Sequence, residues 1–249
     1  NRDGSKIKIM PQRRATLVWP AVAICVAAAI LVSLGVWQLH RLAWKEGLIA
    51  AIETRANAAP QPLPLVEEWP QLRPEVYEYR HVTATGTFEH GEETLVFRAS
   101  GGTAGREPGY HVLTPLRLKS GGYVIVNRGF VPLDRKDQSS RLAGLIQGET
   151  EVTGLMREPE ARNFFTPADD PAAGTYFTRD PGLLAKHFAL APAAPFSIDA
   201  DGTQLPGGWP KGGATERDFS NNHLSYALTW FGLAITLIGV FAAFAWQRR

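Results

Sequence analysis

Two long apolar runs stand at opposite ends of this 249-residue chain, with a polar stretch between them. The first covers residues 16–39 and the second covers residues 224–246, and neither contains a charged side chain. A helix of roughly 20 apolar residues crosses the hydrocarbon core of a bilayer. Both runs are long enough, so the sequence predicts a membrane protein with two spans. Two spans return the chain to its starting side, so the middle must fold on one side and both termini must lie on the other.

The charges that flank the runs predict the orientation. Basic residues lie on the terminal side of both spans: Arg2, Lys6, Lys8, Arg13, Arg14, Arg248 and Arg249. Short basic flanks stay in the cytoplasm, whereas a long loop is translocated largely regardless of its charge. We therefore expect a multi-pass protein of a bacterial inner membrane, with both termini cytoplasmic and the central domain periplasmic. In a mitochondrial protein the domain would face the intermembrane space. The net charge of +2 reflects this topology and gives no reason to expect nucleic-acid binding.

These expectations divide the chain into five parts. They are an N-terminal tail (1–15), the first span (16–39), an external β-rich domain with a preceding helical stalk (40–223), the second span (224–246) and a C-terminal tail (247–249). A cleaved signal peptide is the alternative for the first run, but signal segments are shorter and end at small residues. This run ends in Trp37-Gln38-Leu39-His40-Arg41, which favours a retained span.

Cysteine usage limits what the external domain can be. The only cysteine is Cys25, inside the first span, and the chain has two methionines. The domain therefore has no disulfide even in an oxidising compartment, and a thiolate or methionine copper site is excluded. The domain must be stabilised by its apolar core alone.

The central stretch begins as a helix and then changes to strands. Residues 44–57 keep a helical pattern, which the prolines of 60–64 end, and an extended linker follows as far as Pro74. Alternating or apolar segments then predict strands at 79–88, 94–98, 110–118, 123–131 and 151–156, with an edge strand at 196–199. Gly121-Gly122 predicts a hairpin turn, and Asp180 with Pro181 predicts the start of one short helix. The expected fold is two antiparallel transmembrane helices enclosing an external, mainly antiparallel β (α+β) domain, in which the short strands favour an antiparallel sheet or a small barrel.

No group of residues points to catalysis. The glycine-rich segment 101–109 lacks the Gly-Lys-Ser/Thr ending of a phosphate-binding loop and opens a strand, so it is interpreted as a connection. The adjacent Asp169 and Asp170 lie among prolines and glycine, which is typical of a solvated turn. The chain is therefore not expected to be an enzyme.

Two histidines lie at the ends of the spans. His40 follows the first run and His223 precedes the second, so antiparallel spans would bring both to the same leaflet. Polar groups at this depth are often functional. Tyr226, Ala227 and Trp230 share the helical face of His223. An imidazole, a small residue, aromatic side chains and an arginine such as Arg41 would suit a haem pocket. A belt of interfacial aromatic residues, including Trp37 and Trp44, is the simpler alternative.

Three motifs give the chain a resemblance to a known family. They are Trp37-Gln38-x-x-Arg41-x-x-x-Lys45, Val126-Asn127-Arg128-Gly129-Phe130-Val131-Pro132 and Asn221-x-His223-Leu224-x-Tyr226-Ala227-x-x-Trp230-Phe231. In this order, between and beside two spans, they resemble the Surfeit-locus-one (Shy1-like) family of assembly proteins for haem-copper cytochrome c oxidase. Within the second motif, Arg128 is expected at an exposed strand end, with pairing to a partner as the alternative.

The resemblance implies a function and a site. It implies binding of haem a and its delivery to oxidase subunit one, with haem A synthase and the lipid bilayer as further partners. It implies that His223 is the iron ligand, and the first motif carries over onto Trp37, Gln38 and Arg41. His40 is not part of the family pattern, so a second axial ligand stays open. Two alternatives remain: a membrane scaffold that binds no cofactor, and a haem-modifying enzyme, which would need more spans.

Overall fold

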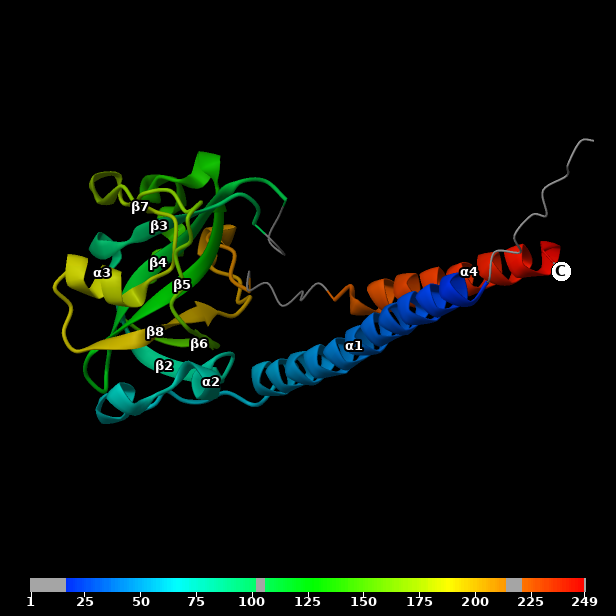
Figure 1. The fold of residues 1–249 in the computed structure, drawn as a ribbon. Helices are drawn as coiled ribbons and strands as arrows, with labels where there is room; N and C mark the ends of the chain where they lie inside the picture. The colour runs from blue at the N-terminus through cyan, green and yellow to red at the C-terminus, as the bar shows by residue number, and fades with distance from the viewer. Residues whose placement is uncertain (1–16, 102–105, 214–220, 249) are drawn as a thin grey trace, which may run out of the picture. The chain divides into compact units, whose positions relative to one another are not determined.

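A computed structural model describes residues 17–101, 106–213 and 221–248 of the chain (Figure 1). The chain divides into two compact units. One combines the terminal segments Asn1–Ile49 and Phe219–Arg249, and the other is Ala50–Asp218. The predicted tail of residues 1–15 lies outside the described residues, as do residues 102–105 of the glycine-rich segment.

The terminal unit holds two long helices. Helix α1 runs over Val18–Ala56 and α4 over His223–Gln247, and each contains an apolar stretch long enough to cross a membrane. The expected helical stalk is present, because α1 continues without a break past the apolar run, and its last turns belong to the second unit. Gly35 of α1 lies against the ring of Phe231 in α4, and the two helices run side by side in opposite directions (Figure 1).

The second unit is built on a sheet that closes on itself. Its strands are β1 (Gln61–Pro62), β2 (His81–Phe88), β3 (Thr94–Arg98), β4 (Gly109–Leu118), β5 (Tyr123–Pro132), β6 (Glu149–Arg157), β7 (Thr175–Tyr176) and β8 (Ala193–Ala200). The order β2-β6-β8-β5-β4 returns to β2, because β2 also pairs with β4. Closure removes unpaired strand edges from this ring. The prediction of apolar helices at both ends of a β-rich domain is confirmed.

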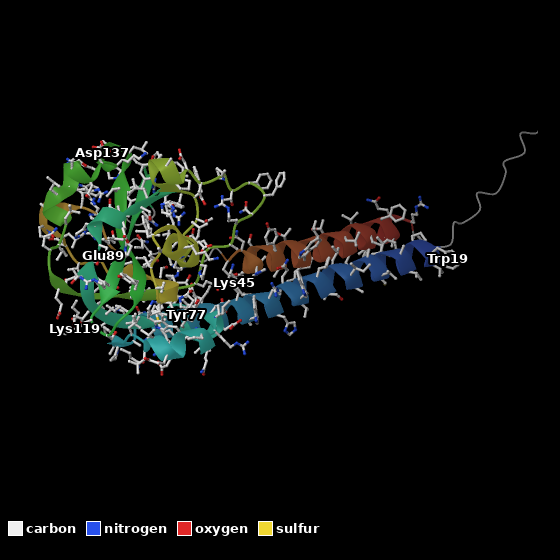
Figure 2. All side chains as sticks on the ribbon, turned by 90° about the vertical axis from the view of Figure 1, so that its left-hand side faces the viewer. Trp19, Lys45, Tyr77, Glu89, Lys119 and Asp137 are labelled. Carbon is white, nitrogen blue, oxygen red and sulfur yellow. The ribbon has the colours of Figure 1, made fainter. Side chains whose placement is uncertain are left out.

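The β4–β5 hairpin is the longest-paired part of the barrel. Its strands are antiparallel, and the turn between them contains Gly121 (φ 98°) and Gly122 (φ 77°). Positive φ is accessible to glycine at little cost, so the predicted hairpin turn is confirmed. Lys119, labelled in Figure 2, lies at the same end of the hairpin.

The barrel interior is filled by alternating residues of the strands. Side chains of β2 alternate between half-buried and buried along its whole length, as its sequence pattern predicts. The Phe196 ring on β8 packs between the rings of Trp69 and Tyr77, at centroid distances of 6.0 and 5.4 Å. The two aromatic partners come from the short helical segments η1 (Val66–Gln71) and α2 (Pro74–Tyr77), which close the barrel on this side.

Two sequence expectations about this domain are wrong. The segment expected as an extended linker up to Pro74 instead contains β1, η1 and the start of α2, because Trp69 supplies an apolar anchor for the core. The strand expected at an edge, β8, lies inside the ring and pairs with both β5 and β6. Its buried pattern on both faces reflects this central position.

The short helix after Asp180 forms as predicted. Helix α3 covers Pro181–His187, and the Asp180 carboxylate accepts a hydrogen bond from the Leu183 N–H at 3.0 Å. This contact satisfies one of the free N–H groups of the first turn. Leu184 turns inward from this helix and packs with Tyr176, Val96 and Leu113 in a second part of the core.

Candidate functional site

Small residues let the two long helices approach each other. Ala227 and Ala234 on α4 are buried, and so is Ala28 on α1. A Cβ atom added to Gly35 would meet the Phe231 ring at 2.6 Å, so this glycine is needed for the close approach. Small residues at helix contacts are typical of membrane helix pairs, since lipid supplies no hydrophobic drive for association.

At one end of this contact, a polar pair joins the two helices. The Nδ1 atom of His223, the first residue of α4, lies 2.7 Å from the Oε1 atom of Gln38 in α1. An amide oxygen can only accept, so Nδ1 carries the proton and donates it to Gln38. In the neutral imidazole of this tautomer, Nε2 carries the lone pair. A ligating histidine commonly has its other ring nitrogen held in this way.

The remaining predicted site residues lie at varying distances from this pair. Ala227, one turn after His223, is fully buried against α1, whereas Tyr226 faces outward and Trp230 is half-buried. On α1, Trp37 and His40 both face outward. Across the described part of the chain, no recorded contact joins any of these residues to the His223 ring. The structure therefore brings Gln38 and His223 together and leaves the aromatic residues around them at the surface of the helix pair.

Arg41 makes a different contact. Its guanidinium carbon lies 4.5 Å from the centroid of the Trp44 ring, one turn further along α1. A stacked guanidinium keeps its charge and its in-plane donors, so it can still pair with a carboxylate. Arg41 follows Gln38 by three residues, which places the two on adjacent turns of one helix face.

The side chains at this site suit a haem group better than a metal ion held by protein ligands alone. Within residues 17–101, 106–213 and 221–248, no group of three or more His, Cys, Asp or Glu side chains could hold a metal ion. A bare ion coordinated only by protein is therefore unsupported by these residues. Haem iron needs a single imidazole with a free nitrogen, and His223 supplies one with its other nitrogen already bound.

A second polar centre, unforeseen from the sequence, is buried on the face of β8 opposite to Phe196 and Ile198, which point into the barrel interior. Asp199 on β8 is buried, and its carboxylate accepts hydrogen bonds from Arg179 (3.1 Å), Arg157 (3.2 Å) and Asn127 (3.0 Å). Burial opposes ionisation of Asp199, but the guanidinium groups of Arg179 and Arg157 outweigh it and hold its pKa below the usual value. The carboxylate is therefore charged and paired, which is the condition for a buried ion to be tolerated.

The same network extends toward β3 and β4. Glu160 pairs with Arg98 at 2.6 Å, and Arg98 also donates to the His111 ring at 3.3 Å. Burial, and then the nearby Arg98 charge, lower the pKa of His111 to about 4. His111 is therefore neutral at physiological pH and accepts from Arg98. Since charges of opposite sign alternate along the network, its contacts support a structural role.

The position of Arg128, in the second motif, differs most clearly from the sequence expectation. It was expected at an exposed strand end, but only 3% of its surface is exposed. Its guanidinium donates to the Gly144 carbonyl, lies 5.0 Å from the Phe88 ring centroid and stands 3.8 Å from the Glu93 carboxylate. Burial lowers its pKa to about 10, so it stays charged. The segment η5 (Gln138–Gly144) covers this part of β5 and encloses the side chain.

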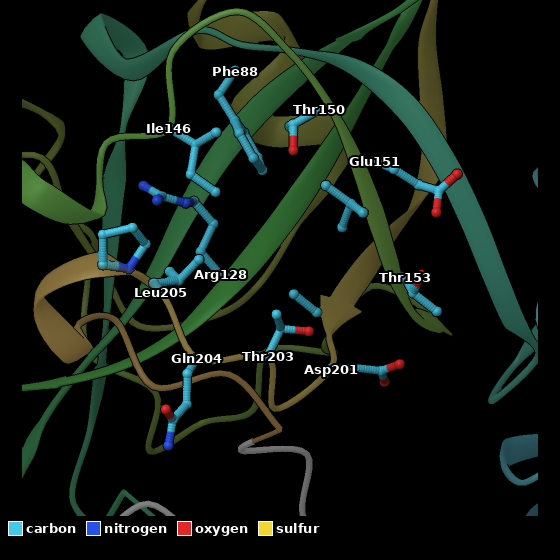
Figure 3. A pocket seen from close by; sticks show the side chains of 13 residues that line it. Phe88, Arg128, Ile146, Thr150, Glu151, Thr153, Asp201, Thr203, Gln204 and Leu205 are labelled. Carbon is cyan, nitrogen blue, oxygen red and sulfur yellow. The ribbon is translucent and has the colours of Figure 1, made fainter.

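A cavity of about 220 Å³ lies beside Arg128 (Figure 3). Residues of β2, β5 and β6 and the segment after β8 line it, among them Phe88, Thr150 and Leu205. Because the Arg128 guanidinium is occupied by Gly144, Glu93 and Phe88, it forms a wall of this cavity. The lining combines apolar and hydroxyl groups with the Glu151 and Asp201 carboxylates, and no functional role follows from it.

Sequence reasoning missed Asp199, Arg157 and Arg179 as a connected group. They are separated by up to 42 residues and lie on different elements, so no local spacing reveals them. The one available signal was a set of charged residues within segments otherwise typical of strands. It indicates an unusual position but not the partner.

These features define a class: a protein anchored by two apolar helices, with a closed β-barrel domain between them and a His–Gln pair joining the helices. The model of the SURF1 family matches residues 25–235. The chain belongs to the SURF1 family.

Curated relatives agree along most of the chain. Mouse Surfeit locus protein 1 is 35% identical over 212 residues, covering 80% of this chain and 67% of the relative. The human Surfeit locus protein 1 is 33% identical over 231 residues, covering 88% and 74%. The SURF1-like protein of Monosiga brevicollis is 35% identical over 244 residues, covering 94% and 89%. The range matched by the family model contains the whole barrel domain and reaches into both long helices.

Proposed function

We propose that this protein is an assembly factor for haem-copper cytochrome c oxidase, which binds haem a and assists its delivery to, or insertion into, oxidase subunit one. Membership of the SURF1 family supports the assembly role. The observation that carries the haem site is the 2.7 Å contact between His223 and Gln38. When bound, haem a would supply an iron that an imidazole nitrogen can hold and propionates that an arginine can pair with.

Within this proposal, His223 would hold the haem iron through Nε2. Gln38 acts on His223 by accepting from Nδ1–H, which fixes the tautomer and the orientation of the ring. It is thus a positioning residue. Arg41, one turn away, is the candidate partner for a propionate. Tyr226, Trp230 and Trp37 would cover the macrocycle, whereas His40 is left without a defined role.

The proposed partners follow from this role. Haem a would be received from haem A synthase and passed on to subunit one, both of them within the bilayer. This accords with a site carried by two apolar helices. The proposed location is a bacterial inner membrane, with the barrel domain in the periplasm. The proposal assigns no enzymatic step to the protein, and the buried Arg157, Asp199 and Arg179 are paired with one another.

A scaffold that binds no cofactor is the second candidate. It is favoured by the barrel, whose buried charges are paired and support a structural role. The first experiment separates the two candidates. The full chain is produced in cells that make haem a, purified in detergent, and its absorbance is recorded. A Soret band in proportion to protein supports the haem site, and a colourless protein favours the scaffold.

Three variants test the ligand assignment side by side. His223→Ala removes the imidazole and should lose most of the bound haem, while the protein still inserts into the membrane. Gln38→Leu removes the hydrogen-bond acceptor for His223 and should lose part of the bound haem. Gln38→Glu restores an acceptor on a side chain of equal length and should recover that haem. His40→Ala is the matched control, since it changes a histidine at the same end of α1. Unchanged haem occupancy in His223→Ala would refute the ligand role.

A further inference from the structure

Two adjacent phenylalanines stand at the tip of the segment between β6 and β7. Phe164 is 95% exposed and Phe165 is 87% exposed, and their rings contact each other edge to face at 5.5 Å. A single exposed apolar residue is common, but two neighbouring phenylalanines with almost no burial form a distinct apolar tip. In water the pair forgoes about 1.5–3 kcal/mol per ring that burial would provide.

The tip is held in place by its own polar neighbours. The Asn163 carboxamide accepts from the Phe165 N–H at 2.9 Å, and the Asn163 N–H donates to the Thr166 hydroxyl at 3.0 Å. Behind it, Arg162 pairs with Asp169 at 2.6 Å and also donates to the Pro167 carbonyl. These contacts present both rings outward instead of letting them fold back onto the barrel.

The base of the segment is joined to the barrel. The Glu160 N–H donates to the Arg179 carbonyl at 2.9 Å, and the Arg179 N–H donates to the Glu160 carboxylate at 3.0 Å. Glu160 also pairs with Arg98 of β3. The apolar tip is therefore attached to the buried ionic network and moves with the barrel.

We propose that the Phe164–Phe165 tip inserts into the interface of the lipid bilayer and holds the barrel against the membrane. The short connections between the domain and the two apolar helices support the lipid bilayer as the partner of this tip. Ten residues lead from Gly213 to His223 at the start of α4, a distance of at most about 35 Å. On the other side, helix α1 links the apolar run to the domain, and the part from Leu39 to Ala56 measures about 26 Å.

These connections are short enough for the domain to approach the bilayer. A domain as long as Ala50–Asp218 has a radius of gyration of about 15 Å. Its surface can therefore reach the bilayer without stretching either connection. Aromatic side chains are favoured at the boundary between headgroups and acyl chains, and an apolar tip gains free energy there without a protein partner. The Arg162–Asp169 pair behind the tip would stay at the level of the headgroups.

The test places a probe at the tip of the full chain. In a Cys25→Ser background, Phe165→Cys is labelled with an environment-sensitive fluorophore and the protein is reconstituted into liposomes of phosphatidylcholine and phosphatidylglycerol. The control is Leu142→Cys, because Leu142 is also an exposed apolar residue of the barrel domain. We expect blue-shifted emission at position 165 and loss of fluorescence when nitroxide-labelled lipids are included, with neither effect at position 142.

Two outcomes would overturn the proposal. Emission at position 165 equal to that at position 142 would show that the tip stays in water. A blue shift that nitroxide lipids do not quench would indicate a protein contact, such as a second copy of the chain. Adding Phe164→Ser to the labelled variant should reduce the quenching, and the domain should keep its thermal stability since this side chain packs on so little. The result does not depend on whether the protein binds haem.

Discussion

At the scale of single residues, the barrel is notable for the charges it encloses. Arg128 has its guanidinium beside Glu93, which is itself paired with Arg141. Two buried guanidinium groups thus share one carboxylate. Removing one partner from a buried ion group is costly when a polar atom is left without a partner. The Gly144 carbonyl and the Phe88 ring would both lose their contact to Arg128.

Arg128→Met tests this enclosure. The methionine keeps much of the side-chain volume but removes the donor to Gly144, so the free energy of unfolding of the barrel should fall by about 2–3 kcal/mol. The measurement is urea unfolding of the full chain in detergent, followed by near-ultraviolet circular dichroism. Arg117→Met is the control, because Arg117 forms a surface pair with Glu89. Equal stability of the two variants would contradict the buried role of Arg128.

His111 predicts a pH dependence of stability. Its pKa is lowered by burial, and then by Arg98, to about 4 in the folded protein, compared with 6.5 for an unperturbed histidine. Between these values the unfolded chain binds a proton that the folded chain does not bind. Stability therefore falls as the pH drops from 6.5 towards 4, and is unaffected by this group above 6.5.

His111→Gln should reduce this loss. Glutamine retains an acceptor for Arg98 but does not titrate, so the decrease in unfolding free energy between pH 6.5 and 4.5 should shrink by about 2–3 kcal/mol. The lowered pKa values of Asp199 and Glu160 add a further loss, but only as the pH falls below their usual values of 3.8 and 4.5. The lowered pKa of His90 acts in the same direction as that of His111 and remains in the variant. Parallel stability curves for the variant and the parent would exclude His111 as the cause.

At the scale of elements, the second motif serves the path of the chain beside β5. Gly129 has a φ of 124°, and a Cβ atom there would lie 2.1 Å from the Lys211 carbonyl oxygen. Phe130 and Lys211 exchange two backbone hydrogen bonds of 2.9 Å at this point. Only glycine permits both the positive φ and the close approach. The motif thus fixes a close antiparallel bridge between two backbone segments.

Gly129→Ala should therefore be strongly destabilising. Strain at positive φ costs about 1–2 kcal/mol, and displacing the Lys211 backbone adds more, so a loss of about 3 kcal/mol or greater is expected. Gly91→Ala is the matched control, because no atom lies within 4 Å of its added Cβ. The two unfolding midpoints are compared in the same detergent. An unfolding midpoint of Gly129→Ala as high as that of the control would show that the Lys211 backbone can move away to accommodate the added Cβ.

Sequence patterns predicted the elements whose signal is local. The strand at 94–98, the Gly121-Gly122 turn and the Asp180 cap each depend on a few adjacent residues. The strand pattern favoured an antiparallel sheet or a small barrel, but it could not decide between them, since closure requires β2 to pair with β4 and β8 to enter between β5 and β6 from a distant part of the chain. The buried position of Arg128 was missed for the same reason: η5 and Glu93, which enclose it, are remote in sequence.

The candidate site was likewise predicted in part. A histidine next to a transmembrane segment can be recognised from hydropathy alone, because it is the polar residue at which the apolar run begins or ends. Its partner Gln38 is 185 residues away, so spacing gives no sign of the contact. Outward-facing side chains such as Tyr226 and Trp37 were grouped with His223 by helical periodicity, which gives the face but not the contacts.

At the scale of the whole molecule, the two apolar helices decide where each part of the chain can be. Both helices are long and apolar enough to span a bilayer, and two such spans would put the barrel domain on one side and both terminal segments on the other. The basic termini favour the cytoplasm for themselves and the opposite side for the barrel. The side matters for function, because His223 and Gln38 lie at the ends of the spans that connect to the barrel.

Labelling of single cysteines tests this arrangement. In a Cys25→Ser background, Ser120→Cys places a thiol at the exposed β4–β5 turn, and a membrane-impermeant maleimide is added to intact bacterial cells whose outer membrane has been permeabilised. We expect labelling of Ser120→Cys before the inner membrane is broken, since the barrel should face the periplasm. Gln247→Cys, in the last turn of α4, is the control and should react only after lysis. The reverse pattern would place the barrel in the cytoplasm, and the proposed haem site would then open toward the wrong leaflet for delivery from the periplasmic side.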